Sequence, residues 1–334
     1  MKWVKETILK VIGYLVGKKK VHHYLIGRGI KLRNLQSFYS SKAPKTLQEE
    51  TKSTLIFMVD GKCLHGGIAD RFKGMLSAYA FAKKHNLEFR IHHIFPFPLE
   101  QIFLSSQYQW QIAADKISYN SDEAKPILLY REDYDTEEAL LWQIKSRHKQ
   151  YHLYSCAACM DTDYNQAFHE LFEFQPFFQN ILDQYKAKLG GAYTAVSFRF
   201  QNLFGDFPEW KFQPLTSDLA KKDLLERALE ALQQIQKNNH GNKILVTADS
   251  TFFLKHVARI EKVVTVQGES VHIDFPQKET SVDPFLKSLV EFFLISKAQQ
   301  STLYRDLKYN TYPSGFPEYA AKLGNIPFKA FCKS

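Results

Sequence analysis

Continuous apolar runs alternate along the chain with segments in which apolar residues recur every three or four positions. The run Leu55–Val59 predicts a strand buried on both faces, because it has no alternating polar positions. From Ile68 to Ala82 the apolar spacing is helical, and strand character returns over Leu87–Phe95. This strand, turn, helix and strand predict a βαβ unit and a doubly wound parallel sheet.

A second series of the same kind begins further along the chain. It predicts a strand over Tyr193–Arg199, a helix over Asp218–Lys237 with Ser217 as its N-cap, and a strand over Lys243–Thr247. Further elements are expected over Thr251–Arg259, Val263–Val266, Asp283–Lys297, Ser301–Tyr304 and Phe316–Leu323. The stretch 98–188 between the two series predicts helices and loops without a repeat. We therefore expect two Rossmann-like domains facing a cleft.

The length of 334 residues exceeds what one hydrophobic core usually organises, which favours two domains. We place a basic N-terminal helix and linker at 1–53, a first, acceptor-side Rossmann-like domain at 54–190, and a second, nucleotide-sugar-binding one at 191–334.

The formal charge of +9 is concentrated in residues 1–53, which carry 12 Lys and Arg against 3 Asp and Glu. The neutral remainder argues against a nucleic-acid-binding body. Apolar residues from Trp3 to Leu15 recur at helical spacing and precede Lys18–Lys20. The apolar run of this basic amphipathic helix is too short to span a bilayer. The helix either packs against the body, or is a poorly ordered terminus, or contacts an anionic membrane surface through residues 1–20.

Four cysteines are too few and too scattered for a disulfide-stapled fold and favour a reducing compartment. We therefore expect a cytoplasmic location, with contact at the inner face of the plasma membrane as the open alternative.

Candidate ligand-binding residues lie at strand ends, because open α/β sheets bind ligands beyond the carboxyl ends of their strands. After the first strand, Gly66 and Gly67 precede a helix and allow a phosphate or sugar to approach backbone N–H groups. The segment contains neither a Walker loop nor a three-glycine dinucleotide fingerprint.

Arg199 follows an apolar strand, where its guanidinium needs an anionic or carbonyl partner. A donor diphosphate is one such partner, and a structural pair with Asp206 or Glu209 is the alternative. After the next strand, Asp249 is placed to accept hydrogen bonds from a base or ribose, and Ser250 is placed to cap the following helix.

These segments resemble, in order, the conserved blocks of GDP-fucose-dependent fucosyltransferases, the protein O-fucosyltransferases and nodulation-type α-1,6-fucosyltransferases. The first block is similar to Gly66–Phe72 with Ala80–Lys83. Ser197-Phe198-Arg199 occupies the place of a His-x-Arg motif, whose Arg matches and whose His is replaced by Ser197. Val246–Ser250 resembles the next block and Ser314-Gly315-Phe316 the last turn.

The resemblance implies a GT-B-like fold and an inverting transfer from GDP-fucose, a co-substrate, with no metal site and no other cofactor. It implies that Arg199 stabilises the GDP leaving group. The donor-binding residues would be Gly66, Gly67, Asp70, Arg199, Asp249, Ser250, Ser314 and Gly315.

Asp206 is the first candidate for the general base that activates the acceptor, with Glu209, Asp60 and His65 as rivals. The acceptor expected is a cell-surface glycan of the O-antigen (lipopolysaccharide) or capsule type. Two alternatives stay open: transfer of another nucleotide sugar, and an inactive glycan- or nucleotide-binding module of the same fold.

Overall fold

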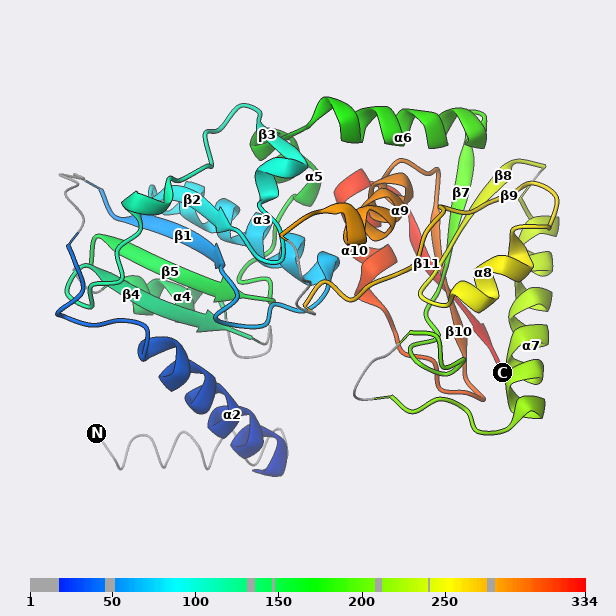
Figure 1. Cartoon of the computed structure of the whole chain (residues 1–334), viewed down its shortest axis with the longest axis horizontal. Helices are drawn as coiled ribbons and strands as arrows, with labels where there is room; N and C mark the ends of the chain where they lie inside the picture. Colours follow the sequence, from blue (N-terminus) through cyan, green and yellow to red (C-terminus); the bar gives the residue numbers. More distant parts are fainter. Residues whose placement is uncertain are drawn as a thin grey trace. The chain divides into compact units, whose positions relative to one another are not determined.

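The computed structural model describes residues 18–45, 52–130, 136–145, 148–207, 212–239, 241–274 and 280–334 (Figure 1). The amphipathic helix expected over residues 3–15 and the candidate base Glu209 lie outside this part of the chain. The helices are α2 (Lys18–Gln36), α3 (Ile68–Lys84), α4 (Glu137–Ile144), α5 (Tyr164–Leu171), α6 (Pro176–Leu189), α7 (Asp218–Lys237), α8 (Thr251–Val257), α9 (Leu286–Ser296) and α10 (Gly315–Gly324). The strands are β1 (Thr54–Val59), β2 (Glu88–His93), β3 (Phe103–Ser105), β4 (Ala124–Leu129), β5 (Gln150–Ser155), β6 (Phe172–Phe174), β7 (Tyr193–Phe198), β8 (Lys243–Ala248), β9 (Val263–Val264), β10 (Ser301–Asp306) and β11 (Phe328–Lys333).

The chain forms two compact units. Unit 1 comprises the described residues of Met1–Leu64, Ala78–His92 and Trp110–Met160, and unit 2 those of His65–Ser77, His93–Gln109 and Asp161–Ser334. This division differs from the boundaries drawn from the sequence, because residues 65–77, 93–109 and 161–190 belong with the C-terminal sheet. None of the helices within the described ranges is long and apolar enough to cross a membrane.

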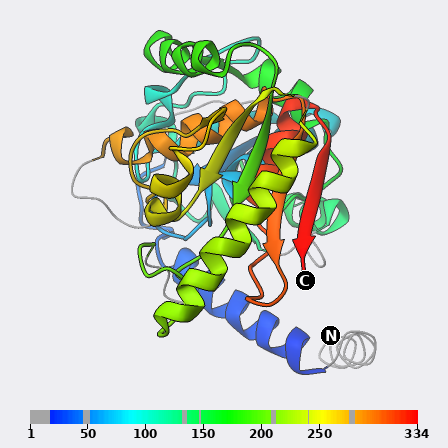
Figure 2. The ribbon, with the colours of Figure 1, turned by 90° about the vertical axis from the view of Figure 1, so that its right-hand side faces the viewer.

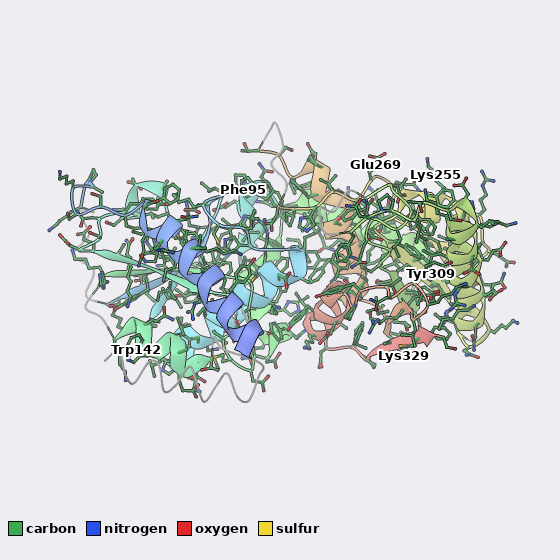
Figure 3. The ribbon with its side chains drawn as sticks, turned by 90° about the horizontal axis from the view of Figure 1, so that it is seen from below. Phe95, Trp142, Lys255, Glu269, Tyr309 and Lys329 are labelled. Atoms are coloured by element: carbon green, nitrogen blue, oxygen red, sulfur yellow. The ribbon has the colours of Figure 1, made fainter. Side chains whose placement is uncertain are left out.

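Unit 1 is built on a four-stranded sheet in the order β2-β1-β5-β4, with β5 parallel to both β1 and β4. All six residues of β1 are buried, as its unbroken apolar run predicts. Helix α2 packs against β4 and contributes Leu35, which is 1% exposed, to a small core with residues of β1, β4 and β5. On α4, by contrast, Trp142 is 74% exposed (Figure 3).

Unit 2 contains a five-stranded parallel sheet in the order β11-β10-β7-β8-β9. The first strand of the series, β7, is central, and the chain then builds outwards through β8 and β9 on one side and β10 and β11 on the other. The direction of winding therefore reverses between β7 and β10, which makes their carboxyl ends a topological switch point. At the outer edge, β11 carries exposed side chains such as Lys329, which discourages edge-to-edge pairing (Figure 3).

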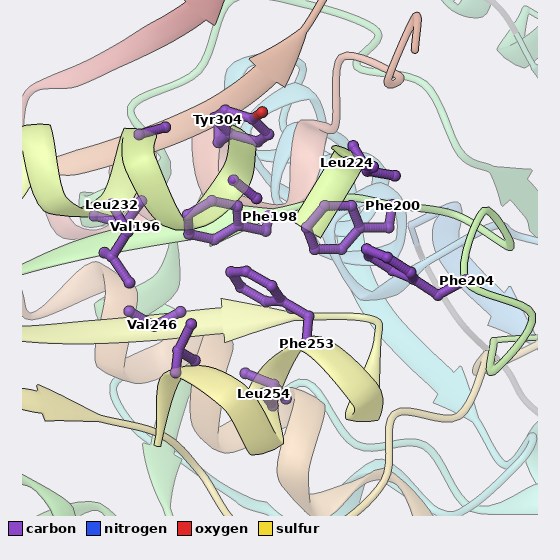
Figure 4. Packing of buried hydrophobic residues seen from close by; sticks show 14 of the residues in the cluster. Val196, Phe198, Phe200, Phe204, Leu224, Leu232, Val246, Phe253, Leu254 and Tyr304 are labelled. Atoms are coloured by element: carbon purple, nitrogen blue, oxygen red, sulfur yellow. The ribbon is translucent and has the colours of Figure 1, made fainter. Parts of the chain in front are cut away.

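Helices cover both faces of this sheet. Helix α7 runs across one face, as Figure 2 shows, and α9 and α10 pack on the other (Figure 1). The core between α7 and the sheet joins aromatic rings to small helical side chains that let the layers approach (Figure 4). Phe198 lies 4.6 Å from Phe253 and 5.0 Å from Tyr304, measured between ring centroids. This packing fixes the ends of β7, β8 and β10, from which the site residues project.

The sequence located most of the elements of unit 2 correctly and missed five strands, two in unit 1 and three in unit 2. Helix α7 spans Asp218–Lys237 as expected, with Ser217 Oγ accepting from the Ala220 amide. Strands β3, β4, β5 and β6 lie in the stretch 98–188 that was assigned to helices and loops, and β11 was not expected either. Strand β5 is fully buried, but Gln150 and His152 interrupt the apolar run that is typical of a central strand. They can be buried because they form hydrogen bonds with Ser118 and Tyr39.

Candidate functional site: a cavity at the switch point of unit 2

A cavity of about 480 Å³ lies in unit 2 at the carboxyl ends of β7 and β8, and Leu303 of the adjacent strand β10 also lines it. This switch-point cavity falls within the range of about 300–1,000 Å³ that is typical of ligand sites. It also meets the first turns of α3 and α10. The residues that line it are Gly66–Asp70, Ser197–Arg199, Gln201, Phe207, Phe212, Thr247–Asp249, Ser270–Ile273, Ser288, Glu291, Leu303, Tyr312 and Ser314–Pro317.

Arg199 enters this cavity from the end of β7. Its Nη1 donates to Asp249 Oδ2 over 2.6 Å, and its guanidinium lies 5.0 Å from the centroid of the Phe207 ring. The Arg199 side chain is 22% exposed, so part of it faces the cavity. A structural ion pair of the kind expected as an alternative therefore exists, but its carboxylate is Asp249 and not Asp206. The pairing follows from the sheet register: Ser197 aligns with Thr247 and Phe198 with Ala248, which brings the next two residues together.

Asp249 already accepts three hydrogen bonds, so its expected role as an acceptor for a base or ribose stays a prediction that these contacts do not favour. Besides Arg199, its carboxylate accepts from the backbone amides of Phe200 (2.9 Å) and Gln201 (2.7 Å). Burial raises the pKa of Asp249, opposed by the charge of Arg199 and the two backbone amides. Asp249 lines the cavity but is occupied in anchoring the arginine and the chain that follows β7.

Ser250 and Asp206 cap helix α8 together. Ser250 Oγ accepts from the Phe253 amide (3.1 Å), which confirms its expected capping role, and donates to Asp206 Oδ2 (2.9 Å). The Phe252 amide also donates to Asp206 Oδ2, over 2.7 Å. Neither Asp206 nor Ser250 is among the lining residues. The donor-binding role of Ser250 and the catalytic role of Asp206 stay predictions, and these contacts do not favour them.

The glycine turn before α3 lines the cavity, but one of its amides is already used. Gly66 has a φ of +77°, which glycine adopts without strain, and its N–H donates to Asp274 Oδ2 over 2.7 Å. Asp274 Oδ1 also accepts from Arg71 Nη2 over 2.8 Å, so this buried ion pair fixes the turn. Burial lowers the pKa of Arg71, opposed by the charge of Asp274. A ligand would therefore meet the amides of the first helical turn from Gly67 onwards.

The last block forms the start of α10. Ser314 is its N-cap, with Oγ accepting from the Phe316 amide (3.3 Å), and both Ser314 and Gly315 line the cavity. The amino-terminal ends of two helices, α3 and α10, thus border the same cavity. Each contributes backbone N–H groups of its first turn and the positive end of a helix dipole, which favour an anion.

Sequence reasoning missed the charged residues that α9 contributes. Glu291 lines the cavity and is 3% exposed, and its Oε1 accepts from Lys287 Nζ over 2.7 Å. Lys287 Nζ also donates to Ser270 Oγ (2.8 Å). Burial raises the pKa of Glu291, opposed by Lys287. The sequence signal for this pair was a Lys and a Glu four residues apart in a mostly apolar helix. Such a helix is expected to be buried, and buried charged side chains are found almost only in pairs.

The rival bases Asp60 and His65 do not line the cavity. Asp60 belongs to unit 1, where Lys62, Tyr119 and Tyr154 donate to its carboxylate over 2.7 to 3.0 Å. Burial acts to raise the pKa of Asp60, but Lys62 outweighs it and the pKa is lowered. His65 is buried in the turn before α3. Within the described ranges, no three His, Cys, Asp or Glu side chains are grouped so that they could hold a metal ion.

No protein-family pattern and no curated protein sequence matches the chain, so the comparisons rest on solved structures. NodZ α-1,6-fucosyltransferase soaked with GDP-fucose is 12% identical over 82% of this chain and 93% of its own, with a TM-score of 0.52. The fucosyltransferase NodZ from Bradyrhizobium is 12% identical over 81% of this chain and 93% of its own, with a TM-score of 0.52. An Arabidopsis thaliana FUT1 variant in complex with GDP is 11% identical over 91% of this chain and 78% of its own, with a TM-score of 0.53. At these identities the likeness shows the fold, and the chain has the GT-B-like α/β fold of these fucosyltransferases.

Proposed function

We propose that this chain is an inverting glycosyltransferase that binds GDP-fucose in the switch-point cavity and transfers fucose to a hydroxyl group of a glycan. The observation that carries the proposal is the convergence of Arg199 with the first turns of α3 and α10 on one cavity. These groups supply fixed positive potential where a diphosphate would sit. The solved structures of the same fold include one soaked with GDP-fucose and one in complex with GDP.

The chemistry of the proposed reaction needs charge stabilisation at the leaving group. When the bond between the sugar and the diphosphate breaks, negative charge accumulates on the β-phosphate. A guanidinium and oriented backbone amides placed before the reaction stabilise that charge without reorganising. This is the basis on which we propose a transfer that does not depend on a metal ion.

Glu291 supports guanine as the base of the donor. Its Oε1 is bonded to Lys287, and the carboxylate is buried against the cavity. A carboxylate accepts hydrogen bonds from the adjacent N1–H and N2–H₂ donors of guanine, whereas the single N–H of uracil stands between two carbonyl acceptors that a carboxylate repels. We therefore propose that the α9 carboxylate selects GDP over UDP.

The acceptor we propose is a cell-surface glycan of the O-antigen or capsule type, elongated on the cytoplasmic side of the membrane. The concentration of basic residues in the first 53 positions supports contact with an anionic membrane surface. A lipid-linked acceptor would lie at that surface.

Calorimetric titration with GDP, UDP and CMP tests the donor assignment without knowledge of the acceptor. We expect GDP to bind at least about tenfold more tightly than either pyrimidine nucleotide, which corresponds to about 1.4 kcal/mol. Equal affinity for the three would refute the guanine assignment. Incubation with GDP-fucose then separates an enzyme, which releases GDP, from a binding module, which retains the intact donor.

A further inference from the structure

Three carboxylates among the described residues line the switch-point cavity, and two of them are buried and paired with a cation. Asp249 holds Arg199 and two backbone amides, and Glu291 is buried and paired with Lys287. The third, Asp70, has a side chain that is 43% exposed. Of these three, Asp70 is the carboxylate that an acceptor hydroxyl arriving from solvent can reach.

The surroundings of Asp70 hold its carboxylate in place. Asp70 is the third residue of α3, and its Oδ1 lies 3.2 Å from Lys73 Nζ. Lys73 is 13% exposed, and its ammonium lies 5.1 Å from the centroid of the Tyr319 ring. One carboxylate oxygen of Asp70 is thus fixed by a cation that is itself packed against an aromatic ring of α10.

The other oxygen, Oδ2, occupies space that exists because residue 66 is glycine. A Cβ added at Gly66 would lie 2.6 Å from Asp70 Oδ2, closer than non-bonded atoms approach, and 3.3 Å from Asp70 Cβ, which is a tight contact. The positive φ of Gly66 and the hydrogen bond from its N–H to Asp274 fix the turn around this space. Gly66 therefore both shapes the turn and leaves room for the carboxylate.

We propose that Asp70 is the general base that activates the acceptor, an inference that rests on the proposed glycosyltransferase function. Asp70 Oδ2 accepts the proton of the acceptor hydroxyl while the acceptor oxygen bonds to C1 of the fucosyl group. The bond between C1 and the β-phosphate oxygen breaks, and its electron pair remains on GDP. The protonated carboxyl group then loses its proton to water.

This assignment differs from both roles that the sequence suggested. The carboxylate of Asp206, the first candidate base, accepts hydrogen bonds at the amino terminus of α8, and Asp206 does not line the cavity. Asp70 itself was expected among the donor ligands. A carboxylate repels a diphosphate, however, whereas it attracts the proton of a neutral hydroxyl group. The acceptor side of the reaction therefore suits Asp70 better.

Asp70→Asn tests the proposal, with water and methanol as probe acceptors and GDP-fucose as donor. We expect the rates of hydrolysis and of methyl fucoside formation to fall about 10²- to 10⁴-fold, with the Kd for GDP unchanged within about twofold. Asp183→Asn is the matched control, because Asp183 forms an i,i+3 pair with Lys186 on α6 outside the cavity and is 52% exposed. That control should retain wild-type rates.

Lys73 is a positioning residue in this scheme. Lys73→Met should lower kcat while leaving the KM for GDP-fucose unchanged, and Lys73→Arg should restore much of the rate, because it returns a cation beside Asp70 Oδ1. A structural role alone would change the melting temperature without this split between kcat and KM.

Several outcomes would overturn the assignment. Asp70→Asn that retains the wild-type rate, or that weakens GDP binding more than tenfold, shows that Asp70 is a bystander or a donor ligand. A larger loss of rate in Asp206→Asn or in Glu209→Gln assigns the base to that residue. Wild-type protein that fails to bind GDP refutes the proposed function itself, and wild-type protein that binds GDP without any turnover refutes both proposals.

Discussion

Replacement of Arg199 by alanine separates the two roles that the structure gives this side chain. As a ligand of the diphosphate, Arg199 would contribute charge-assisted hydrogen bonds of about 1.5–3 kcal/mol, so its removal should raise the Kd for GDP about 10- to 150-fold. The Asp249 carboxylate that remains adds repulsion toward the diphosphate. Calorimetric titration at one salt concentration measures this loss.

The same substitution should destabilise the fold, because Asp249 is buried and loses its cation. The two backbone amides from Phe200 and Gln201 remain, and Arg199 is 22% exposed, which lets water replace part of the pair. We therefore expect a loss of about 2 kcal/mol in the free energy of unfolding, below the 3–5 kcal/mol typical of a fully buried pair. Denaturant unfolding at pH 7 measures it.

The stability loss should depend on pH in a defined direction. The pKa of Asp249 is already raised by burial, and loss of Arg199 raises it further. In the unfolded chain an aspartate has a pKa of about 3.9, so Asp249 of the native variant binds a proton at a higher pH than in the unfolded chain. The free energy of unfolding of the variant therefore falls as pH rises through the native pKa of Asp249. Acidification from pH 7 towards 4 should therefore reduce the difference in unfolding free energy between variant and wild type.

A second variant distinguishes the two roles. Arg199→Ala combined with Asp249→Asn should recover part of the stability but not the GDP affinity. The buried charge is removed, whereas the Asn amide can accept from only one of the Phe200 and Gln201 amides and the diphosphate contact stays lost. Arg227→Ala is the matched control, because Arg227 pairs with the buried Asp306 over 2.7 Å outside the cavity. In this variant the Tyr304 hydroxyl and the Tyr309 amide still donate to the Asp306 carboxylate. It should lose stability and keep its GDP affinity. If Arg199→Ala also leaves the Kd for GDP unchanged, the arginine is structural and the diphosphate assignment is wrong.

Three further changes probe the rest of the site. Glu291→Gln should weaken GDP binding about tenfold or more while leaving UDP binding unchanged, which a titration series with both nucleotides measures, and an equal loss for both would exclude base recognition. Gly66→Ala should lower the free energy of unfolding by about 1–2 kcal/mol because residue 66 has a positive φ, and it should slow turnover because the added Cβ displaces Asp70. A loss of stability without slower turnover would show that Gly66 does not make space for the Asp70 carboxylate. Turnover of GDP-fucose should persist with a chelator present, and its restoration by Mn²⁺ after chelation would refute metal independence.

Short-range features of this chain could be predicted from the sequence because the interactions that produce them are local. The apolar run of β1, the helical spacing of α3 and the caps Ser217 and Ser250 all involve residues within a few positions of one another. The order of the elements in unit 2, and the placement of polar residues at the ends of its strands, followed from the same patterns. These features indicated two Rossmann-like halves, and the resemblance of the blocks to fucosyltransferases implied the GT-B-like fold.

Strands with polar buried residues could not be identified in that way. Gln150 and His152 in β5 resemble surface residues until their partners are known, because a buried polar side chain is stable where distant groups satisfy its hydrogen bonds. The segment 161–190 was assigned to the first domain although it packs with unit 2, because its apolar side chains meet partners far away in the sequence, such as Phe293 against Phe168.

At the candidate site, the sequence by itself determined which blocks carry glycine, arginine and serine at the ends of strands and the starts of helices. Tertiary structure alone decided which of these groups neutralise one another. The parallel register of β7 and β8 pairs Arg199 with Asp249, and the Gly66 amide is taken by Asp274, more than 200 positions away. Such contacts depend on how strands align and helices pack, so only the folded chain shows that Asp249 is occupied and that Asp70 remains accessible.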